Sequence, residues 1–144
     1  MTRAIQVFQV GVKAFLWHEQ RLLLLQERDQ QARWELPGGR IDVGEENLPI
    51  EDVLARELRE ELGTRFGCDI GAIGACWVRR AEAQRPLPVF LVGLLCTAPR
   101  GEIVLSDEHQ ALRWVARDGW QQLDLAAGYR EVLAKFFADT TPCL

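Results

Sequence analysis

The sequence predicts an α/β sandwich in which helices cover a mixed sheet. Short apolar stretches typical of strands occur in both halves of the chain, a helix with a leucine stripe lies between them, and a second amphipathic helix follows the last one. The 144 residues are enough for one sizeable core, and no composition break suggests a linker. We therefore expect residues 1–144 to form a single domain.

The first elements are expected to form a β-hairpin. In "QVGVKAF", residues 9–15, apolar side chains alternate with polar or small ones, which is the period of a half-buried strand. The run "LLLLQ", residues 22–26, predicts a second and more deeply buried strand after the turn at residues 17–21. Residues 33–49 contain turn residues throughout and are expected to be a loop.

A helix is predicted from Pro49 to Leu62. Proline suits a first helical turn, and Gly63 ends the helix. Leu54, Leu58 and Leu62 recur every four residues and would form its buried stripe.

The second half of the chain predicts three further strands and a closing helix. The expected strands cover residues 71–80, 87–96 and 111–115. Residues 126–139 predict an amphipathic helix, in which Val132, Leu133, Phe136 and Phe137 face the core.

Composition excludes several classes of protein. The 17 basic residues against 21 acidic ones give a net charge of −4, which argues against extended nucleic-acid binding. Nothing in the sequence resembles a secretory leader, and every apolar run is too short to span a membrane. The four cysteines contain no C-x-x-C pair, so we expect reduced, mostly buried thiols, no structural zinc site and a cytoplasmic protein.

The predicted central helix carries an unusual concentration of acids. In "RELREELG", Glu57, Glu60 and Glu61 would fall within about a third of the helix circumference, at the margin of the buried stripe. Like charges at this spacing repel each other, and partial burial would raise their pKa values. A surface helix with neighbouring arginines is one explanation. A site for a hard divalent cation such as Mg²⁺ is the other.

The preceding loop favours the cation site. "PGGRIDVGEE", residues 37–46, contains three glycines that allow close backbone approach to a ligand. Gly39 and Gly44 have the glycine spacing of a P-loop, but acids occupy the positions of its Lys and Ser/Thr. The only serine, Ser106, lies outside any nucleophile elbow. Metal-assisted attack by water, with carboxylates as ligands and base, is the chemistry that remains.

These residues closely resemble the Nudix box. The pattern runs from Gly39 through Glu45 to Arg56-Glu57-Leu58-Arg59-Glu60-Glu61-Leu62-Gly63, and "WELPGG" before it also resembles the family. The resemblance implies a Nudix-type α/β/α sandwich with a mixed sheet. It departs from the family pattern at one place, because ten residues instead of seven separate Glu45 from Arg56. The three extra residues, roughly Glu46–Leu48, should bulge outward from the turn.

The resemblance also implies roles for individual residues. Glu57, Glu60 and Glu61 would bind Mg²⁺ or Mn²⁺, together with the carbonyl of Gly39. Arg56 would hold Glu57 through an ion pair. The base that activates water would be Glu57 or, from a later loop, Glu108. His109 is expected to be an ordinary surface or core histidine.

Three further residues are candidates for substrate binding, each with a simpler alternative. Arg28 and Arg33 would contact phosphates or be ordinary solvated arginines. Trp34 would stack on a base or, like the other tryptophans, belong to the core.

The resemblance implies a metal-dependent hydrolase that cleaves the pyrophosphate linkage of a nucleoside diphosphate joined to another group. A nucleoside triphosphate or dinucleoside polyphosphate is the expected small-molecule substrate. The alternatives are an RNA 5′ pyrophosphohydrolase, with Arg79, Arg80 and Arg85 as a local basic patch, and a non-catalytic module that senses nucleotides. Both a monomer and a homodimer remain open.

Overall fold

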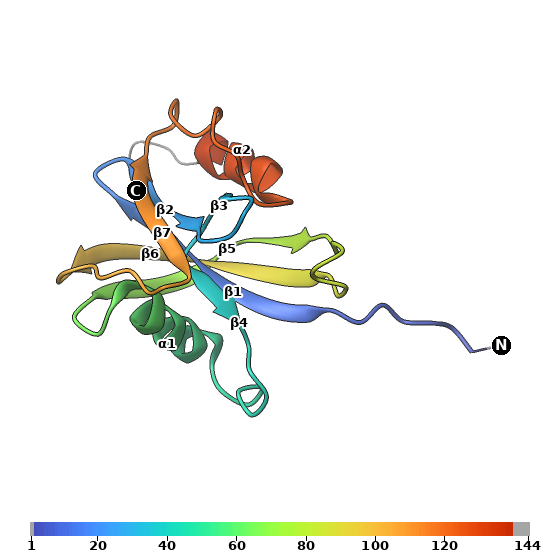
Figure 1. The fold of residues 1–144 in the computed structure, drawn as a ribbon. Helices are drawn as coiled ribbons and strands as arrows, with labels where there is room; N and C mark the ends of the chain where they lie inside the picture. Colours follow the sequence, from blue (N-terminus) through green and yellow to red (C-terminus); the bar gives the residue numbers. More distant parts are fainter. Residues whose placement is uncertain (1, 140–144) are drawn as a thin grey trace.

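A computed structural model of the chain describes residues 2–139 (Figure 1). It contains seven strands and two helices within this range. In chain order these are β1 (Gln9–His18), β2 (Arg21–Glu27), β3 (Trp34–Glu35), β4 (Gly38–Arg40), α1 (Ile50–Leu62), β5 (Gly67–Arg79), β6 (Val89–Arg100), β7 (His109–Val115) and α2 (Tyr129–Asp139).

The strands form a mixed sheet around β1. β1 runs parallel to β6, from Gln9 opposite Val89 to Leu16 opposite Cys96, and antiparallel to β4 on its other side. β5 extends the sheet beyond β6 as an antiparallel neighbour. The hairpin end of β1 pairs with β2, which itself pairs with β3 and β7. The predicted hairpin and mixed sheet are therefore confirmed.

The two helices cover opposite sides of the strands (Figure 1). The predicted stripe of Leu54, Leu58 and Leu62 is buried against one face, with Ala14 and Leu16 of β1 in the same core. Phe15, between those two residues in sequence, points into the other core, where it stacks on Phe136 of α2. The α/β/α sandwich is confirmed, and β1 is its central strand.

The sequence-based prediction differs from the structure in three main respects, besides shifts of up to three residues at the ends of β1, β2, α1, β7 and α2. β3 and β4 lie inside the predicted loop of residues 33–49, because strands of two and three residues have no periodicity and are defined by their partners, β2 and β1. β5 begins at Gly67 and β6 continues to Arg100, so both strands are longer than predicted. β1 is buried on both faces from Gly11 to Leu16 rather than half-buried, since elements cover it on each side.

Residues 2–139 contain three of the four cysteines. Cys68, Cys76 and Cys96 are free, but only Cys96 is buried, because the other two lie on an edge strand. Cys143 lies outside the described residues. No helix in the described part of the chain is long and apolar enough to cross a membrane.

Candidate active site

The acidic residues of α1 do not share one environment. Glu57 and Glu61 are buried, with 9% and 3% of their surface exposed, because residues four apart lie on the same side of the helix. Glu60 is exposed and accepts hydrogen bonds from Arg56 Nη1 at 3.2 Å. The expectation that all three acids sit at the buried margin is therefore correct for two of them. Glu60 lies outermost of the three on the wheel and faces solvent.

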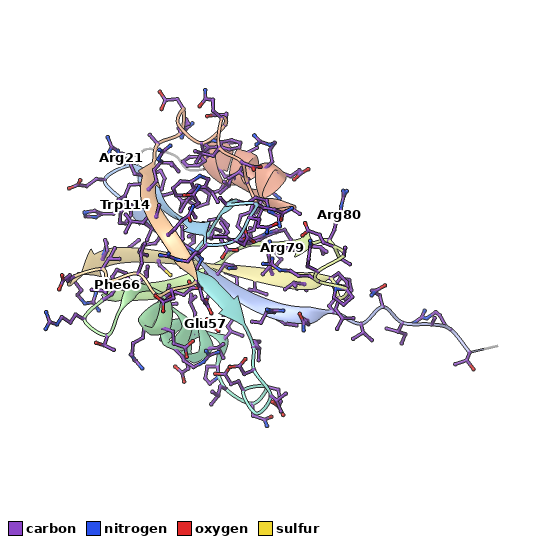
Figure 2. The ribbon with its side chains drawn as sticks, in the orientation of Figure 1. Arg21, Glu57, Phe66, Arg79, Arg80 and Trp114 are labelled. Atoms are coloured by element: carbon purple, nitrogen blue, oxygen red, sulfur yellow. The ribbon has the colours of Figure 1, made fainter. Side chains whose placement is uncertain are left out.

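The glycines of β4 bring the backbone against these carboxylates. Glu57 of α1 lies beside β4 (Figure 2). A Cβ atom on Gly39 of that strand would collide with the Glu57 carboxylate. The N–H of Gly38 donates to Glu61 Oε2 at 2.8 Å. Gly38 has φ +128° and packs against the backbone of Val12, so a side chain is excluded there as well. The backbone of β4 thus lies directly beside the two buried acids, Glu57 and Glu61.

Arg56 organises the acids from the solvent side. Its Nη1 lies 3.0 Å from Glu57 Oε1, and its Nε and Nη2 donate to the two carboxylate oxygens of Glu45, both at 2.6 Å. Glu45 keeps this two-point contact although the loop before α1 is three residues longer than the Nudix pattern. Residues Glu46, Asn47 and Leu48 are exposed, as expected for a segment that bulges outward.

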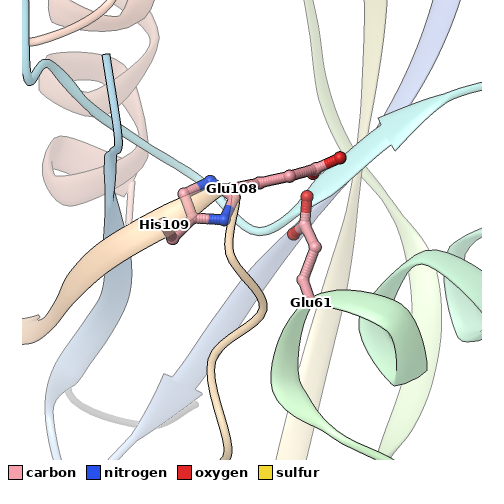
Figure 3. Close-up of side chains that lie close together, drawn as sticks. All are labelled: Glu61, Glu108 and His109. Atoms are coloured by element: carbon pink, nitrogen blue, oxygen red, sulfur yellow. The ribbon is translucent and has the colours of Figure 1, made fainter. Parts of the chain in front are cut away.

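A second segment completes the cleft opposite α1. The N–H of Ser106 donates to the Glu61 carbonyl at 3.1 Å, and the N–H of Val104 donates to the Leu62 carbonyl at 2.9 Å. This connection docks the β6–β7 loop on the end of α1 and brings Glu108 and His109 toward Glu61 (Figure 3). One ligand atom from each of these three side chains lies within 4.8 Å of the others.

A buried network of charges lies beside this cluster. Glu35 of β3 accepts a hydrogen bond from Arg79 at 3.2 Å and lies 3.6 Å from Lys13 Nζ. Arg79 also donates to Glu27 at 3.1 Å. Lys13 donates to the carbonyls of Leu36 and Gly38, at 3.1 and 2.9 Å, and so supports the turn into β4. All four charged side chains are buried and line the cleft.

Local sequence patterns do not predict this network of charges. The alternation in residues 9–15 predicts that Lys13 lies on the polar face of a half-buried strand, whereas both faces of β1 are covered. Glu27 and Glu35 lie at the ends of the paired strands β2 and β3, whereas Arg79 lies at the end of β5, which pairs with β6, so only the tertiary fold brings Arg79 to the two acids. The one local signal is a charged residue at the end of each apolar run.

The cleft has a volume of about 600 Å³ and contains charges of both signs. A family model of the NUDIX domain matches residues 7–136, which is most of the chain. The chain belongs to the Nudix family. It is accordingly a Nudix-type pyrophosphohydrolase, as the sequence analysis expected.

Known relatives agree with this assignment of the chain to the Nudix family. The nucleoside triphosphatase NudI of Salmonella newport (strain SL254) is 30% identical over 111 residues, which cover 71% of this chain and 74% of the relative. The solution structure of the E. coli ORF135 protein matches with a TM-score of 0.76 and 27% identity, over 96% of each chain. A MutT NUDIX hydrolase from Burkholderia pseudomallei has a TM-score of 0.73 and 26% identity, over 94% of this chain and 100% of the other.

The Nudix box acids are well suited to a divalent cation, which enzymes of this family generally need. Burial raises the pKa of Glu61 to about 7, although Lys13 and the Gly38 N–H oppose the shift. Burial and the charge of Glu60 raise the pKa of Glu57, against the effect of Arg56. The positive groups around Glu57 and Glu61 therefore do not fully stabilise the ionised forms of these two carboxylates, which need further positive charge nearby. A bound cation would supply this charge.

Three other buried groups of the cleft, Glu27, Glu35 and His109, have shifted pKa values. Burial and the contact with Glu35 raise the pKa of Glu27 to about 7. Burial opposes ionisation of Glu35, yet Lys13 and the hydrogen bonds from His109 and Glu27 lower its pKa well below the usual range. Burial would lower the pKa of His109, but Glu35 and Glu61 outweigh it and raise the value. Glu35 is thus the ionised carboxylate of the network.

The candidate substrate-binding residues are only partly brought together in this Nudix structure. Arg28 lines the cleft, and its Nη2 lies 3.4 Å from the His109 carbonyl. Arg33 does not line it and instead forms a two-point ion pair with Glu82, at 2.9 and 3.1 Å. Trp34 is buried in the α2-side core, with the Arg113 guanidinium 5.4 Å from its ring centre. The structure therefore favours the core alternative for Trp34.

Proposed function

We propose that this chain is a single catalytic domain, residues 1–144, that hydrolyses the phosphoanhydride linkage of nucleoside triphosphates with the help of a divalent cation. The observation that carries this proposal is one cleft with an acidic wall on α1 and basic side chains around it. A cation on the acidic wall and arginines opposite would together neutralise a polyphosphate. The name of the NudI relative, a nucleoside triphosphatase, supports this substrate class.

The Nudix box would hold the cation. Glu57, Glu60, Glu61 and the carbonyl of Gly39 are its proposed ligands, and Glu60 would turn from its exposed contact with Arg56 to take part. When bound, Mg²⁺ or Mn²⁺ would neutralise charge on the phosphates and stabilise the charge that develops during attack. Arg56 would keep Glu57 in place through its 3.0 Å ion pair.

Glu57 is the proposed base that orients and deprotonates the attacking water. Its raised pKa makes it a better proton acceptor than an ordinary exposed carboxylate. Its position against Gly39 also restricts its rotation. Glu108, the other candidate, is exposed, and only its backbone is fixed, by the N–H of Arg28 at 2.9 Å. Water would attack one phosphorus, and the remaining phosphate-bearing group would leave.

Two arginines are positioned to receive the phosphates. Arg28 and Arg40 line the cleft, and within residues 2–139 their side chains donate only to neutral oxygens, the His109 carbonyl and the Gln9 side chain. Their charge therefore remains available to an anion. Arg40 follows Gly39 directly, so a phosphate held there would lie next to the proposed cation ligands.

The two alternative functions receive less support. An RNA 5′ pyrophosphohydrolase would use Arg79, Arg80 and Arg85, but Arg79 is buried between two glutamates and Arg85 lies 3.9 Å from Glu27. A sensor without catalysis would not need Glu57 to be held against the backbone of Gly39, and this chain retains every acid of the Nudix box. Dinucleoside polyphosphates present the same anhydride chemistry and belong in the same test.

The test is a product-resolved screen of nucleoside triphosphates, dinucleoside polyphosphates and 5′-triphosphorylated RNA with Mg²⁺ or Mn²⁺. We expect turnover of triphosphates by the wild type and a loss of about 10²-fold or more in E57Q. E108Q should lose far less, and H18Q, at an exposed histidine outside the cleft, should match the wild type. Turnover of RNA alone, or normal turnover by E57Q, would contradict the proposal.

A further inference from the structure

His109 is held in an orientation that the proposed catalysis does not use. Its Nε2 lies 3.0 Å from Glu35 Oε1, and both side chains are buried. Arg79 and Lys13 hold Glu35 in its ionised form, so Glu35 accepts and the imidazole donates from Nε2. In the neutral ring, Nδ1 then carries the lone pair. This atom is buried and has no hydrogen-bond partner in the part of the chain that the structure describes.

Two carboxylates lie around this ring at the end of the cleft (Figure 3). One ligand atom of His109 lies within 4.8 Å of a carboxylate oxygen of both Glu61 and Glu108. Glu61 uses Oε2 to accept from Gly38, which leaves Oε1 for another partner. Glu108 is exposed, and its side chain forms no hydrogen bond or ion pair with the described residues, so a small rotation can bring its carboxylate closer.

The backbone fixes all three residues before any ligand arrives. The N–H of Ser106 binds the Glu61 carbonyl, the N–H of Arg28 binds the Glu108 carbonyl, and His109 lies opposite Glu27 in the β2–β7 pair. A histidine whose second ring nitrogen donates to a carboxylate is the arrangement found at metal sites, because the carboxylate fixes the tautomer and makes the imidazole a stronger ligand. Glu35 has this position here.

We propose that Glu61, Glu108 and His109 Nδ1 form a second cation subsite that takes a first-row transition cation, Mn²⁺ or Zn²⁺, in preference to Mg²⁺. Carboxylates alone suit Mg²⁺, whereas an imidazole ligand favours transition metals. The inference rests on the proposed function in one respect, since Glu61 also belongs to the proposed catalytic cation site. The subsite adds a nitrogen ligand that the acidic face of α1 does not contain.

Nitrogen ligation can be measured without any turnover. Mn²⁺ bound to the wild type should show electron-spin-echo modulation from an imidazole ¹⁴N nucleus. H109Q should lose this modulation, because glutamine can still donate to Glu35 from the position of Nε2 but offers no ring nitrogen. H18Q, which removes the only other histidine, should keep it.

Calorimetry provides the second measurement, at about pH 8 so that protons compete little for the imidazole. Zn²⁺ affinity should fall by about tenfold or more in both H109Q and E108Q, while Mg²⁺ affinity should stay within about twofold. E108Q changes an exposed side chain, so it is suitable even if H109Q folds poorly.

The outcomes separate this inference from the proposed function. No ¹⁴N modulation in the wild type, or unchanged Zn²⁺ affinity in both variants, would overturn the subsite and leave His109 as the structural partner of Glu35. E57Q should keep the ¹⁴N modulation while it loses turnover. If triphosphates are not hydrolysed but the modulation is present and depends on His109, the proposed function fails and the subsite stands.

Discussion

The side chain of Glu57 fills the space beside the backbone of Gly39, so Gly39 cannot carry a side chain of its own unless Glu57 moves. The Cβ of any other residue at Gly39 would meet the Glu57 carboxylate. Unlike Gly38, Gly39 does not have a positive φ, so its small size is what the position requires. The glycine at position 39 is therefore needed to make room for the Glu57 carboxylate and not to allow an unusual backbone conformation.

G39A should consequently displace Glu57 while the fold survives. We expect cation affinity to fall by about tenfold and turnover by more, because a misplaced base costs additional rate. Calorimetry with Mn²⁺ and a turnover assay measure the two effects. G119A is the matched control, since a Cβ there meets only ordinary contacts at 3.7 Å. Equal Mn²⁺ affinity in G39A and G119A would show that the close contact between Gly39 and Glu57 plays no part in cation binding.

Lys13 offers a residue-scale test of the buried charges. Its ammonium is the common partner of Glu35 and two carbonyls, and Glu61 also feels its charge. Removing one partner of a buried ion pair typically costs about 3–5 kcal/mol, since the other charge remains unpaired. K13M should lower the free energy of unfolding by about this amount in urea denaturation. K135M, at the only other lysine, which is exposed, should change it little.

At the scale of elements, the loop before α1 is the main departure from the family pattern. Its extra residues are exposed, while Glu45 at its start remains bound to Arg56. Residues of α1 that face the cleft are held by the helix itself, whose leucine stripe is buried. The loop therefore acts on the site mainly through Arg56, which binds Glu45 and also lies 3.6 Å from Asp42.

Deleting Glu46–Leu48 should leave Mn²⁺ affinity within about threefold, because a change in loop length alters closure entropy little. Turnover should fall more than affinity, to the degree that Glu45 no longer reaches Arg56. E45Q is the informative control, since it weakens the same contact with the loop length unchanged. Loss of Mn²⁺ binding in a deletion variant of normal helical content would show that the loop shapes the cation site.

Local patterns in the sequence predicted the long elements because each of these elements is one continuous segment with its own period. In α1 the same segment carries both the leucine stripe and the acids. The leucine stripe and the Glu57–Glu61 spacing are properties of one continuous segment. β3 and β4 were missed, since two or three residues carry no period and depend on their partner strands. The same reason explains why the contact of Glu35 with His109, 74 positions away, could not be predicted.

At the scale of the whole molecule, burial of acids between the layers couples stability to pH. The pKa of Glu61 rises from 4.5 to about 7, and that of Glu27 does the same. Both groups bind protons more tightly in the folded state, so their ionisation destabilises the fold as pH rises through this window. Glu61 faces Lys13, Glu35 and His109. The raised pKa of His109 acts in the same direction above its ordinary value, and Glu35 stays ionised throughout.

We therefore expect the metal-free protein to lose stability between about pH 5 and 7. The loss from Glu61 should be at most on the order of 3 kcal/mol, and urea denaturation in the presence of EDTA measures it. E61Q should flatten the pH dependence without abolishing it, because Glu27 remains. Saturating Mn²⁺ should oppose the loss, since a cation favours the ionised form. A metal-free protein whose stability rises over this range would contradict the pKa assignment.

The docking of the β6–β7 loop on the end of α1 has a consequence for motion. The amides of Val104 and Ser106 donate hydrogen bonds to the carbonyls of Leu62 and Glu61, respectively. The loop therefore cannot open unless it releases the last turn of α1. These amides should therefore exchange with solvent deuterium at the rate set by one shared local opening. A cation held between Glu61 and Glu108 would bridge the two segments and slow that exchange at both. The two walls of the cleft would then open and close as one unit.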